Sequence, residues 1–267
     1  MHQLQHNLPQ LYDIRGGGGF YESNLYRENA AEIVLLDAFN ARHDYRVLEK
    51  MNITKTEIFR NKIFMDIGCG GGGYADFING VAAKVILIEP NKSFAEQLQQ
   101  KGYEVFSYLE QALEKYANSI DVITSWDVIE HVENPQNHMQ NICELLASGG
   151  TAYIGTPSDF PVLRTLLGAK FENFLFMLEH PWIFSRKSLE IMAENCRFSQ
   201  SQADGQVKWE TKFYQRYGIG NLLAWLHLVQ PKGDIQYNFI SQQLESLYKA
   251  DMAREETADY IVIEITK

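Results

Sequence analysis

Between residues 62 and 157 the sequence alternates short apolar runs with segments that have helical spacing or helix start and stop signals. The runs are KIFMDIG, KVILIEP, YEVFSY, SIDVITSW and TAYIGTP, and a further run, DYIVIEITK, closes the chain. Strands that alternate with helices form parallel sheets, because each crossover helix returns the chain to the same end of the sheet. We therefore expect an α/β fold with a Rossmann-like, doubly wound, mostly parallel sheet.

A glycine-rich loop follows the first apolar run, in MDIGCGGGGYADF. Gly68 allows a tight turn out of the strand, and Gly70 lets the backbone approach a ligand without a Cβ in the way. The spacing of Gly68, Gly70 and Gly73 fits the fingerprint of dinucleotide sites, whereas that of Gly68, Gly70 and Gly72 fits a loop that holds S-adenosylmethionine. The glycines alone do not choose between the two cofactors.

Two carboxylates flank this loop. Asp66 lies two residues before Gly68, where it would repel a pyrophosphate but suits a ligand with an ammonium and a sulfonium. Glu89 ends the second run, 19 residues after Gly70, and can accept the hydroxyls of a ribose. Because both cofactors contain a ribose, only Asp66 favours S-adenosylmethionine.

Several segments together resemble the class I S-adenosylmethionine-dependent methyltransferases, in particular the small-molecule group that includes the ubiquinone-type O-methyltransferases. They are MDIGCGGGGYADFI, VILIEP, DVITSWDVIEHVENPQNHMQNICELLASGGTAYIGTPS and HPWIFSRKSLEIMAENCRF. The resemblance runs from about Phe64 to Phe198 and resumes at the last strand. It implies a seven-stranded sheet with a reversed last hairpin, and a cofactor over the carboxyl ends of the strands.

The resemblance also implies cofactor contacts. Those at the methionine and ribose end are Asp66, Gly68, Cys69 and Gly70, those at the ribose and adenine are Glu89 and Pro90, and those under the methionine are Trp126 and Asp127. The family often has an acidic residue after the third strand, where it meets the adenine amine. Here that stretch reads FSYLEQ, so Tyr108 and Leu109 occupy the adenine region and backbone contacts would replace the carboxylate.

His131 and His180 are the candidate catalytic residues. Methyl transfer from a sulfonium is an in-line displacement, and a base is needed only where the acceptor loses a proton, as a phenol or alcohol does. Histidine titrates near neutral pH. His131 lies in DVIEHV after the fourth run, and His180 in LEHPWIF at the end of an aromatic-rich insertion. Each has a structural alternative: His131 bonded to backbone, and His180 packed on Trp182.

A metal site is a third interpretation of DVIEHV. Asp127, Glu130 and His131 have the spacing i, i+3, i+4, which places them on one face if this loop turns helically. Some relatives with the pattern E-x-x-E-H are thought to bind magnesium there. The scaffold and base interpretations of His131 are both favoured over this one, so we predict no metal site.

The order of the expected helices and strands divides the chain into parts. Residues 1–59 read as a mostly helical N-terminal segment, and residues 60–210 with 253–267 as the cofactor-binding domain. An aromatic insertion at 157–184 and two amphipathic helices at 211–252 interrupt that domain. We expect both interruptions to form a lid over the pocket that supplies most acceptor contacts.

Composition limits the partners of this chain. Its 267 residues hold 24 Lys and Arg against 34 Asp and Glu, a formal net charge of −10, without a basic run. Such a chain repels phosphate backbones, so we expect a small organic acceptor rather than nucleic acid. It has no signal-peptide pattern, no apolar stretch long enough to span a membrane, and no zinc spacing among three cysteines. We expect a cytoplasmic protein without membrane contact.

Two other function classes stay open at this point. A NAD(P)-dependent oxidoreductase would use the third glycine of the fingerprint but leaves Asp66 and DVIEHV unexplained. A non-catalytic module that only binds the cofactor would have no use for a lid. The sequence does not fix the oligomeric state or the acceptor atom.

Overall fold

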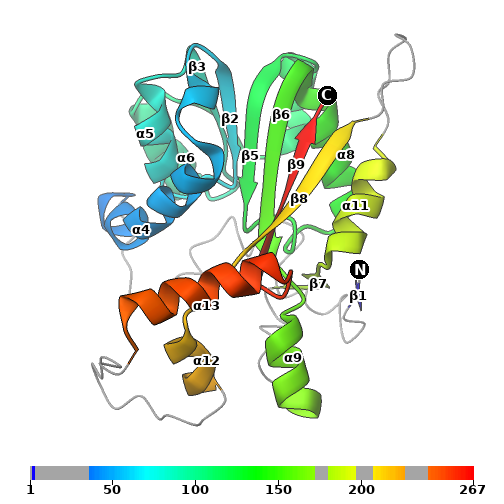
Figure 1. The fold of residues 1–267 in the computed structure, drawn as a ribbon. Coiled ribbons are helices and arrows are strands. Elements are labelled where there is room, and N and C mark those ends of the chain that lie inside the picture. Colours follow the sequence, from blue (N-terminus) through cyan, green and yellow to red (C-terminus); the bar gives the residue numbers. More distant parts are fainter. Residues whose placement is uncertain (1, 4–35, 172–179, 197–206, 226–239) are drawn as a thin grey trace.

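The computed structural model describes residues 2–3, 36–171, 180–196, 207–225 and 240–267. Its centre is a seven-stranded sheet with the order β4-β3-β2-β5-β6-β9-β8 (Figure 1). The strands are β2 (Ile63–Ile67), β3 (Lys84–Ile88), β4 (Glu104–Phe106), β5 (Ile120–Trp126), β6 (Leu146–Pro157), β8 (Lys208–Tyr214) and β9 (Tyr260–Thr266). The pairs among β2 to β6 are parallel, and β9 is antiparallel to both β6 and β8. The predicted fold class, with its reversed last hairpin, is confirmed.

Helices cover both faces of the sheet. The first face packs against α4 (Leu36–Thr54), α5 (Gly73–Asn79) and α6 (Lys92–Gln100), and the second against α7 (Leu109–Tyr116), α8 (Pro135–Leu145) and α11 (Arg186–Glu194). Alternate residues of each strand point to opposite faces. Phe64 accordingly lies in the core under the first set of helices, and its neighbour Met65 in the core under the second.

Side chains that accept backbone N–H groups set where several helices begin. Asn91 accepts the N–H of Phe94 at 3.1 Å before α6, and Asn134 accepts that of Asn137 at 3.0 Å before α8, whose first residue is proline. Such caps satisfy N–H groups that have no partner inside the helix. Ser185 likewise accepts the N–H of Ser188 at the start of α11.

A third group of helices lies beyond the carboxyl ends of the parallel strands. It consists of α9 (Pro161–Leu167), the 3-10 turn η3 (Gly168–Lys170), α12 (Ile219–Trp225) and α13 (Gln242–Arg254) (Figure 1). One boundary prediction is wrong: residues 211–214 are not helical but continue β8, because Thr211 and Phe213 pair with Ile263 and Ile261 of β9.

The N-terminal segment 1–59 is described only in part. Its helical character is seen in α4 and in the 3-10 turn η2 (Glu57–Phe59). The two-residue strand β1 (His2–Gln3) pairs with β7 (Trp182–Ile183); the sequence did not predict this pair. In the described part of the chain, every helix falls short of the length or apolar character that a bilayer-spanning segment needs.

Candidate active site

The loop between β2 and α5 needs its glycines. Gly68, Gly70 and Gly72 have φ values of +68°, +58° and +74°, in the left-handed region where a Cβ causes strain. The N–H of Gly68 donates to the carbonyl of Ile88 at 2.9 Å, which ties the loop to the end of β3. A Cβ on Gly68 would overlap a methyl group of Val128. The loop therefore brings bare backbone to the carboxyl edge of the sheet.

Glu89 follows β3 and lies buried beside this loop. Its carboxylate accepts the N–H of Gly70 at 2.7 Å and the N–H of Asn91 at 2.9 Å. The glycine loop and the end of β3 are thus held together by one side chain. The contact of Glu89 with ribose hydroxyls stays a prediction.

Buried polar atoms without a hydrogen-bond partner gather at the carboxyl edge of the described sheet. Five of the seven such atoms among the described residues lie there: Asp66 Oδ2, Trp126 Nε1, Glu130 Oε1, Arg216 Nη2 and Tyr260 OH. The other two are Arg186 Nε in α11 and Thr211 Oγ1 in β8. Leaving a buried polar atom unpaired costs about 1–3 kcal/mol, so such atoms are few in folded proteins and each calls for an explanation. Their concentration marks this edge as a place built to meet polar groups of a ligand.

Asp66 and Trp126 belong to adjacent strands of this edge. Burial raises the pKa of Asp66, while Thr124 donates to its Oδ1 at 2.6 Å. The ring of Trp126 lies against Gly155 of β6 and close to Tyr260, so that a Cβ on Gly155 would approach both side chains to 2.5 Å. The flat ring needs a glycine beside it.

The remaining predicted cofactor residues occupy different environments. Burial raises the pKa of the Cys69 thiol well above its ordinary value, with further increases from the charges of Glu89 and Asp66, so the thiol stays protonated. Tyr108 is exposed at the start of α7, whereas Leu109 is buried in the core beneath that helix. Pro90 is half-buried next to Glu89. An adenine contact at these three positions stays a prediction.

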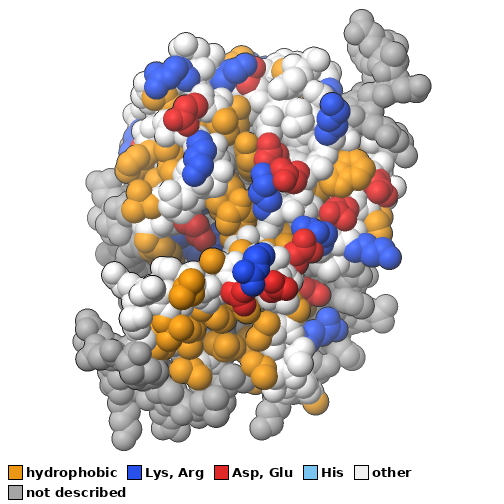
Figure 2. Space-filling model, viewed as in Figure 1, with side chains coloured by type: hydrophobic (Ala, Val, Ile, Leu, Met, Phe, Trp, Pro, Cys, Tyr) orange, Lys and Arg blue, Asp and Glu red, His pale blue; other side chains and the backbone are white. Residues whose placement is uncertain are grey.

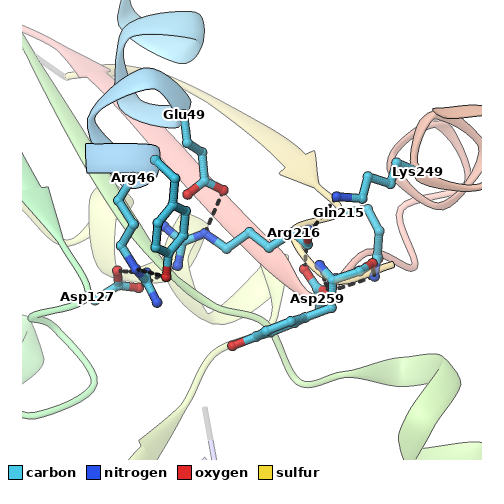
Figure 3. A network of polar contacts seen from close by, with 9 residues as sticks. Arg46, Glu49, Asp127, Gln215, Arg216, Lys249 and Asp259 are labelled. Carbon is cyan, nitrogen blue, oxygen red and sulfur yellow. Dashed lines mark hydrogen bonds and ion pairs between the residues drawn. The ribbon is translucent and has the colours of Figure 1, made fainter. Parts of the chain in front are cut away.

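Asp127 lies at the centre of an ion-pair network (Figure 3). Its Oδ2 is 3.0 Å from Arg46 Nη1, and its Oδ1 is 2.8 Å from Arg216 Nη1. Arg216 Nε also pairs with Glu49 at 2.9 Å, and the Arg216 guanidinium lies 3.1 Å from the centre of the Tyr260 ring. Burial acts to raise the pKa of Asp127, but Arg216 and Arg46 outweigh it and lower the pKa, so Asp127 stays ionised.

Asp259 holds the backbone that carries Arg216. Its carboxylate accepts the N–H of Arg216 at 2.7 Å, the N–H of Tyr217 at 2.9 Å and the side chain of Gln215 at 2.6 Å. Burial raises the pKa of Asp259 to about 6, although these donors oppose the shift. The segment after β8 is therefore fixed to the start of β9.

The two predicted histidines come together. The ring centres of His131 and His180 are 4.7 Å apart, and His131 Nε2 is 3.9 Å from Glu130 Oε1. Glu130 Oε2 accepts the hydroxyl of Thr156 at 3.0 Å. Burial, followed by the charge of Asp127, raises the pKa of Glu130 to about 8. A carboxyl group that exchanges its proton near neutral pH therefore lies beside two imidazoles.

The predicted alignment of Asp127, Glu130 and His131 on one helical face is wrong. Asp127 has a φ of +56° and the following residues form a turn, in which the N–H of His131 donates to the carbonyl of Val128 at 2.9 Å. Asp127 consequently faces two arginines, whose charges disfavour a cation there. The ligand atoms of Glu130, His131 and His180 lie within 4.8 Å of one another, and this is the one group in the described chain with the proximity that a metal requires.

Arg46 and Arg216 were not predicted from the sequence. They are separated from Asp127 by 81 and 89 positions, and neither lies in a recognisable motif. The one available signal was an acidic residue directly after a buried strand, where a carboxylate that loses part of its contact with water favours a cationic partner. That preference does not say which cation supplies it.

The comparisons with known proteins point to one family. A family profile described as "Methyltransferase domain" matches residues 39–198. The ubiquinone biosynthesis O-methyltransferase of Coxiella burnetii is 28% identical over 167 residues, which cover 56% of this chain and 71% of that protein. The mitochondrial ubiquinone biosynthesis O-methyltransferase of Homo sapiens is 33% identical over 103 residues, which cover 34% of this chain and 28% of that protein.

Solved structures share the fold. A SAM dependent methyltransferase from Archaeoglobus fulgidus matches with a TM-score of 0.52 at 14% identity, over 92% of this chain and 100% of that chain. The plantazolicin methyltransferase, solved with SAH, matches with a TM-score of 0.56 at 11% identity, over 97% of each chain. At these identities the similarity establishes architecture and leaves the acceptor open.

Proposed function

We propose that this chain, which belongs to the methyltransferase domain family and is a class I S-adenosylmethionine-dependent methyltransferase, methylates an oxygen of a small organic acceptor. The observation that carries the proposal is the cluster of Glu130, His131 and His180 at the carboxyl edge of the sheet. An oxygen acceptor must lose a proton, and this cluster contains groups that can take one. Family membership sets aside the NAD(P)-dependent oxidoreductase.

The residues at the edge fit the polar groups of S-adenosylmethionine. The unpaired Oδ2 of Asp66 suits an ammonium, and Arg46, which pairs with Asp127 at the same edge, is a candidate partner for the carboxylate of the same amino acid. Glu89 lies where hydroxyls of a ribose are expected, beside the N–H of Gly70. When bound, the cofactor supplies an activated methyl group on a sulfonium.

In this proposal His131 takes the proton of the acceptor hydroxyl. Glu130 stabilises the resulting imidazolium when its own carboxyl is ionised, because opposite charges attract strongly at a buried site. His180, with its ring against His131, orients that imidazole. Since the pKa of Glu130 is about 8, turnover should increase as pH rises through that value.

We also propose that α9, α12 and α13 form the lid over this edge. Their position beyond the carboxyl ends of the strands supports it (Figure 1). Hydrophobic side chains gather over α12 and α13 (Figure 2), and Leu244 and Leu247 of α13 are exposed. A lid of this kind would exclude water from the reacting atoms. Phe174 and Phe176 of the aromatic insertion lie outside the described residues.

The test is methyl transfer to acceptors that differ in one atom. The protein is incubated with methyl-labelled S-adenosylmethionine and, separately, with catechol, aniline or 1,2-dimethoxybenzene, and the products are identified by mass spectrometry. We expect label on the oxygen of catechol and none on the dimethoxy compound. Label on aniline with none on catechol would contradict an oxygen acceptor.

A further inference from the structure

A cavity of about 640 Å³ opens beside the ion-pair network. It lies between α4, the segment that follows β8, and α13, and it is lined by side chains that include Arg46, Glu49, Arg216 and Lys249. Its volume is within the range of pockets that hold small organic ligands. Since Arg46 and Arg216 both contact Asp127 at the end of β5, the cavity adjoins the edge where the cofactor is expected.

The charges that line this cavity are mostly positive. Arg46, Arg216 and Lys249 face a single lining carboxylate, that of Glu49, in a chain whose formal net charge is −10. Asp127 and Asp259, which bind the arginine segments, do not belong to the lining. Glu49 and Asp127 pair with the two arginines, so an anionic ligand would be held by the donors that these pairs leave over rather than by a large net positive field.

Two of these cations have donor capacity left. Arg216 Nη2 is buried and has no hydrogen-bond partner, although Nε and Nη1 of the same guanidinium are paired. Lys249 Nζ donates to the backbone carbonyl of Arg216 at 2.8 Å and forms no ion pair with any residue the structure describes. An ammonium has three donors. These donors lie at opposite ends of Arg216, because Lys249 contacts its backbone carbonyl whereas its guanidinium lies beside Asp127 and Glu49. The Lys249 ammonium is therefore the group that an anionic oxygen would pair with directly.

The rest of the lining suits an organic body attached to that group. Tyr45, Tyr214 and Tyr217 provide aromatic surface, and Leu48 and Ile53 provide aliphatic surface. Figure 3 shows Lys249 and the backbone of Arg216 meeting on one side, while the Arg216 side chain extends toward Glu49 and Asp127. A ligand with an apolar or aromatic body and one anionic end matches this division.

We propose that the methyl acceptor carries a carboxylate or phosphate, and that Lys249 binds this group in the cavity between α4 and α13, with the Arg216 guanidinium adding electrostatic attraction from farther along the same lining. That the bound anion is the methyl acceptor rests on the proposed function, but the anion site itself is tested by binding alone. Arg216 and Lys249 then select among acceptors, and the reacting hydroxyl lies toward Asp127 and His131.

The experiment measures binding of matched probes by calorimetry to the full chain saturated with S-adenosylhomocysteine, so that the cofactor's own carboxylate site is filled. The probes are benzoate, phenyl phosphate and the neutral benzamide. We expect one or both anions to bind at least tenfold more tightly than benzamide, and the tighter anion identifies the group. A charge-assisted hydrogen bond contributes about 1.5–3 kcal/mol, which corresponds to about tenfold or more in affinity.

Variants locate the effect. Lys249→Gln should reduce the preference for the anion about tenfold. Arg216→Lys keeps the positive charge but loses the planar guanidinium, and should reduce the preference by a smaller factor. Arg254→Gln is the control, because Arg254 lies on the same helix, is exposed and does not line the cavity. It should keep the full preference.

Equal binding of benzoate, phenyl phosphate and benzamide, or an unchanged preference in Lys249→Gln, would overturn the proposal. Failure of the proposed function looks different: anion binding would follow the pattern above while catechol receives no methyl group. Thermal unfolding of each variant with S-adenosylhomocysteine bound confirms that the compared proteins are folded.

Discussion

The glycine loop and the arginine network are two halves of one edge, built by different means. Gly68 donates its N–H to the backbone of β3 and Gly70 donates its N–H to the carboxylate of Glu89, so the loop and the end of β3 meet over 21 positions or fewer. Arg46 and Arg216 reach Asp127 from helix α4 and from the segment after β8, 170 positions apart. The glycine loop is built from backbone, so an added side-chain atom would disturb it. The arginine network is built from charged side chains, which can form ion pairs with other partners.

The largest effect is expected at Gly68. Gly68→Ala places a Cβ at φ +68° and against Val128, so strain and overlap together should lower the free energy of unfolding by about 3 kcal/mol and abolish S-adenosylhomocysteine binding. Gly80→Ala is the matched control, since nothing lies within 4 Å of its Cβ position. Denaturant unfolding and calorimetry measure both. A Gly68→Ala protein as stable as Gly80→Ala would contradict the backbone account.

A second effect depends on pH and concerns Glu130. The folded chain holds its proton up to about pH 8, whereas the unfolded chain releases it near 4.5. Folded protein thus binds the extra proton between these values, and the free energy of unfolding falls as pH rises through this interval. Glu130→Gln removes that dependence. Between pH 5 and pH 9 its stability relative to the native chain should improve by about 4 kcal/mol; parallel stability curves would contradict the raised pKa.

The two arginines of the network should differ in their contribution to stability. Arg216 is 11% exposed and pairs with two carboxylates, whereas Arg46 is 31% exposed and pairs with one. Arg216→Met should lower the free energy of unfolding by about 2 kcal/mol and Arg46→Met by less than about 1 kcal/mol, because exposed pairs contribute little. High salt should reduce the smaller effect first. Equal losses of stability in the two variants would contradict the claim that burial makes Arg216 the larger contributor.

The halves also differ in how far the sequence predicts them. The alternation of strands and helices and the spacing of Asp66, Gly68 and Glu89 are local sequence patterns. Local patterns of this kind predict the structure of the segments that contain them. The end of β8 was missed because residues 211–214 are amphipathic in either conformation and only pairing with β9 decides between them. The arginine network depends on contacts between distant segments, which no local pattern encodes.

DVIEHV shows the same limit at a smaller scale. The helical spacing predicted that Asp127, Glu130 and His131 share a face, but the positive φ of Asp127 turns its carboxylate toward the arginines. His180 joins Glu130 and His131 instead, from the end of the aromatic insertion. The residue types were predictable, and their partners were not.

The most direct test of the account separates cofactor binding from proton removal in His131→Asn. Calorimetry gives the Kd for S-adenosylhomocysteine, and single-turnover methylation of catechol gives the rate of the chemical step. The account predicts a Kd within about threefold of the native chain and a rate reduced by about a hundredfold to ten-thousandfold, the usual range for loss of a general base. A near-native rate, or a rate that falls only in proportion to a weakened Kd, would contradict it.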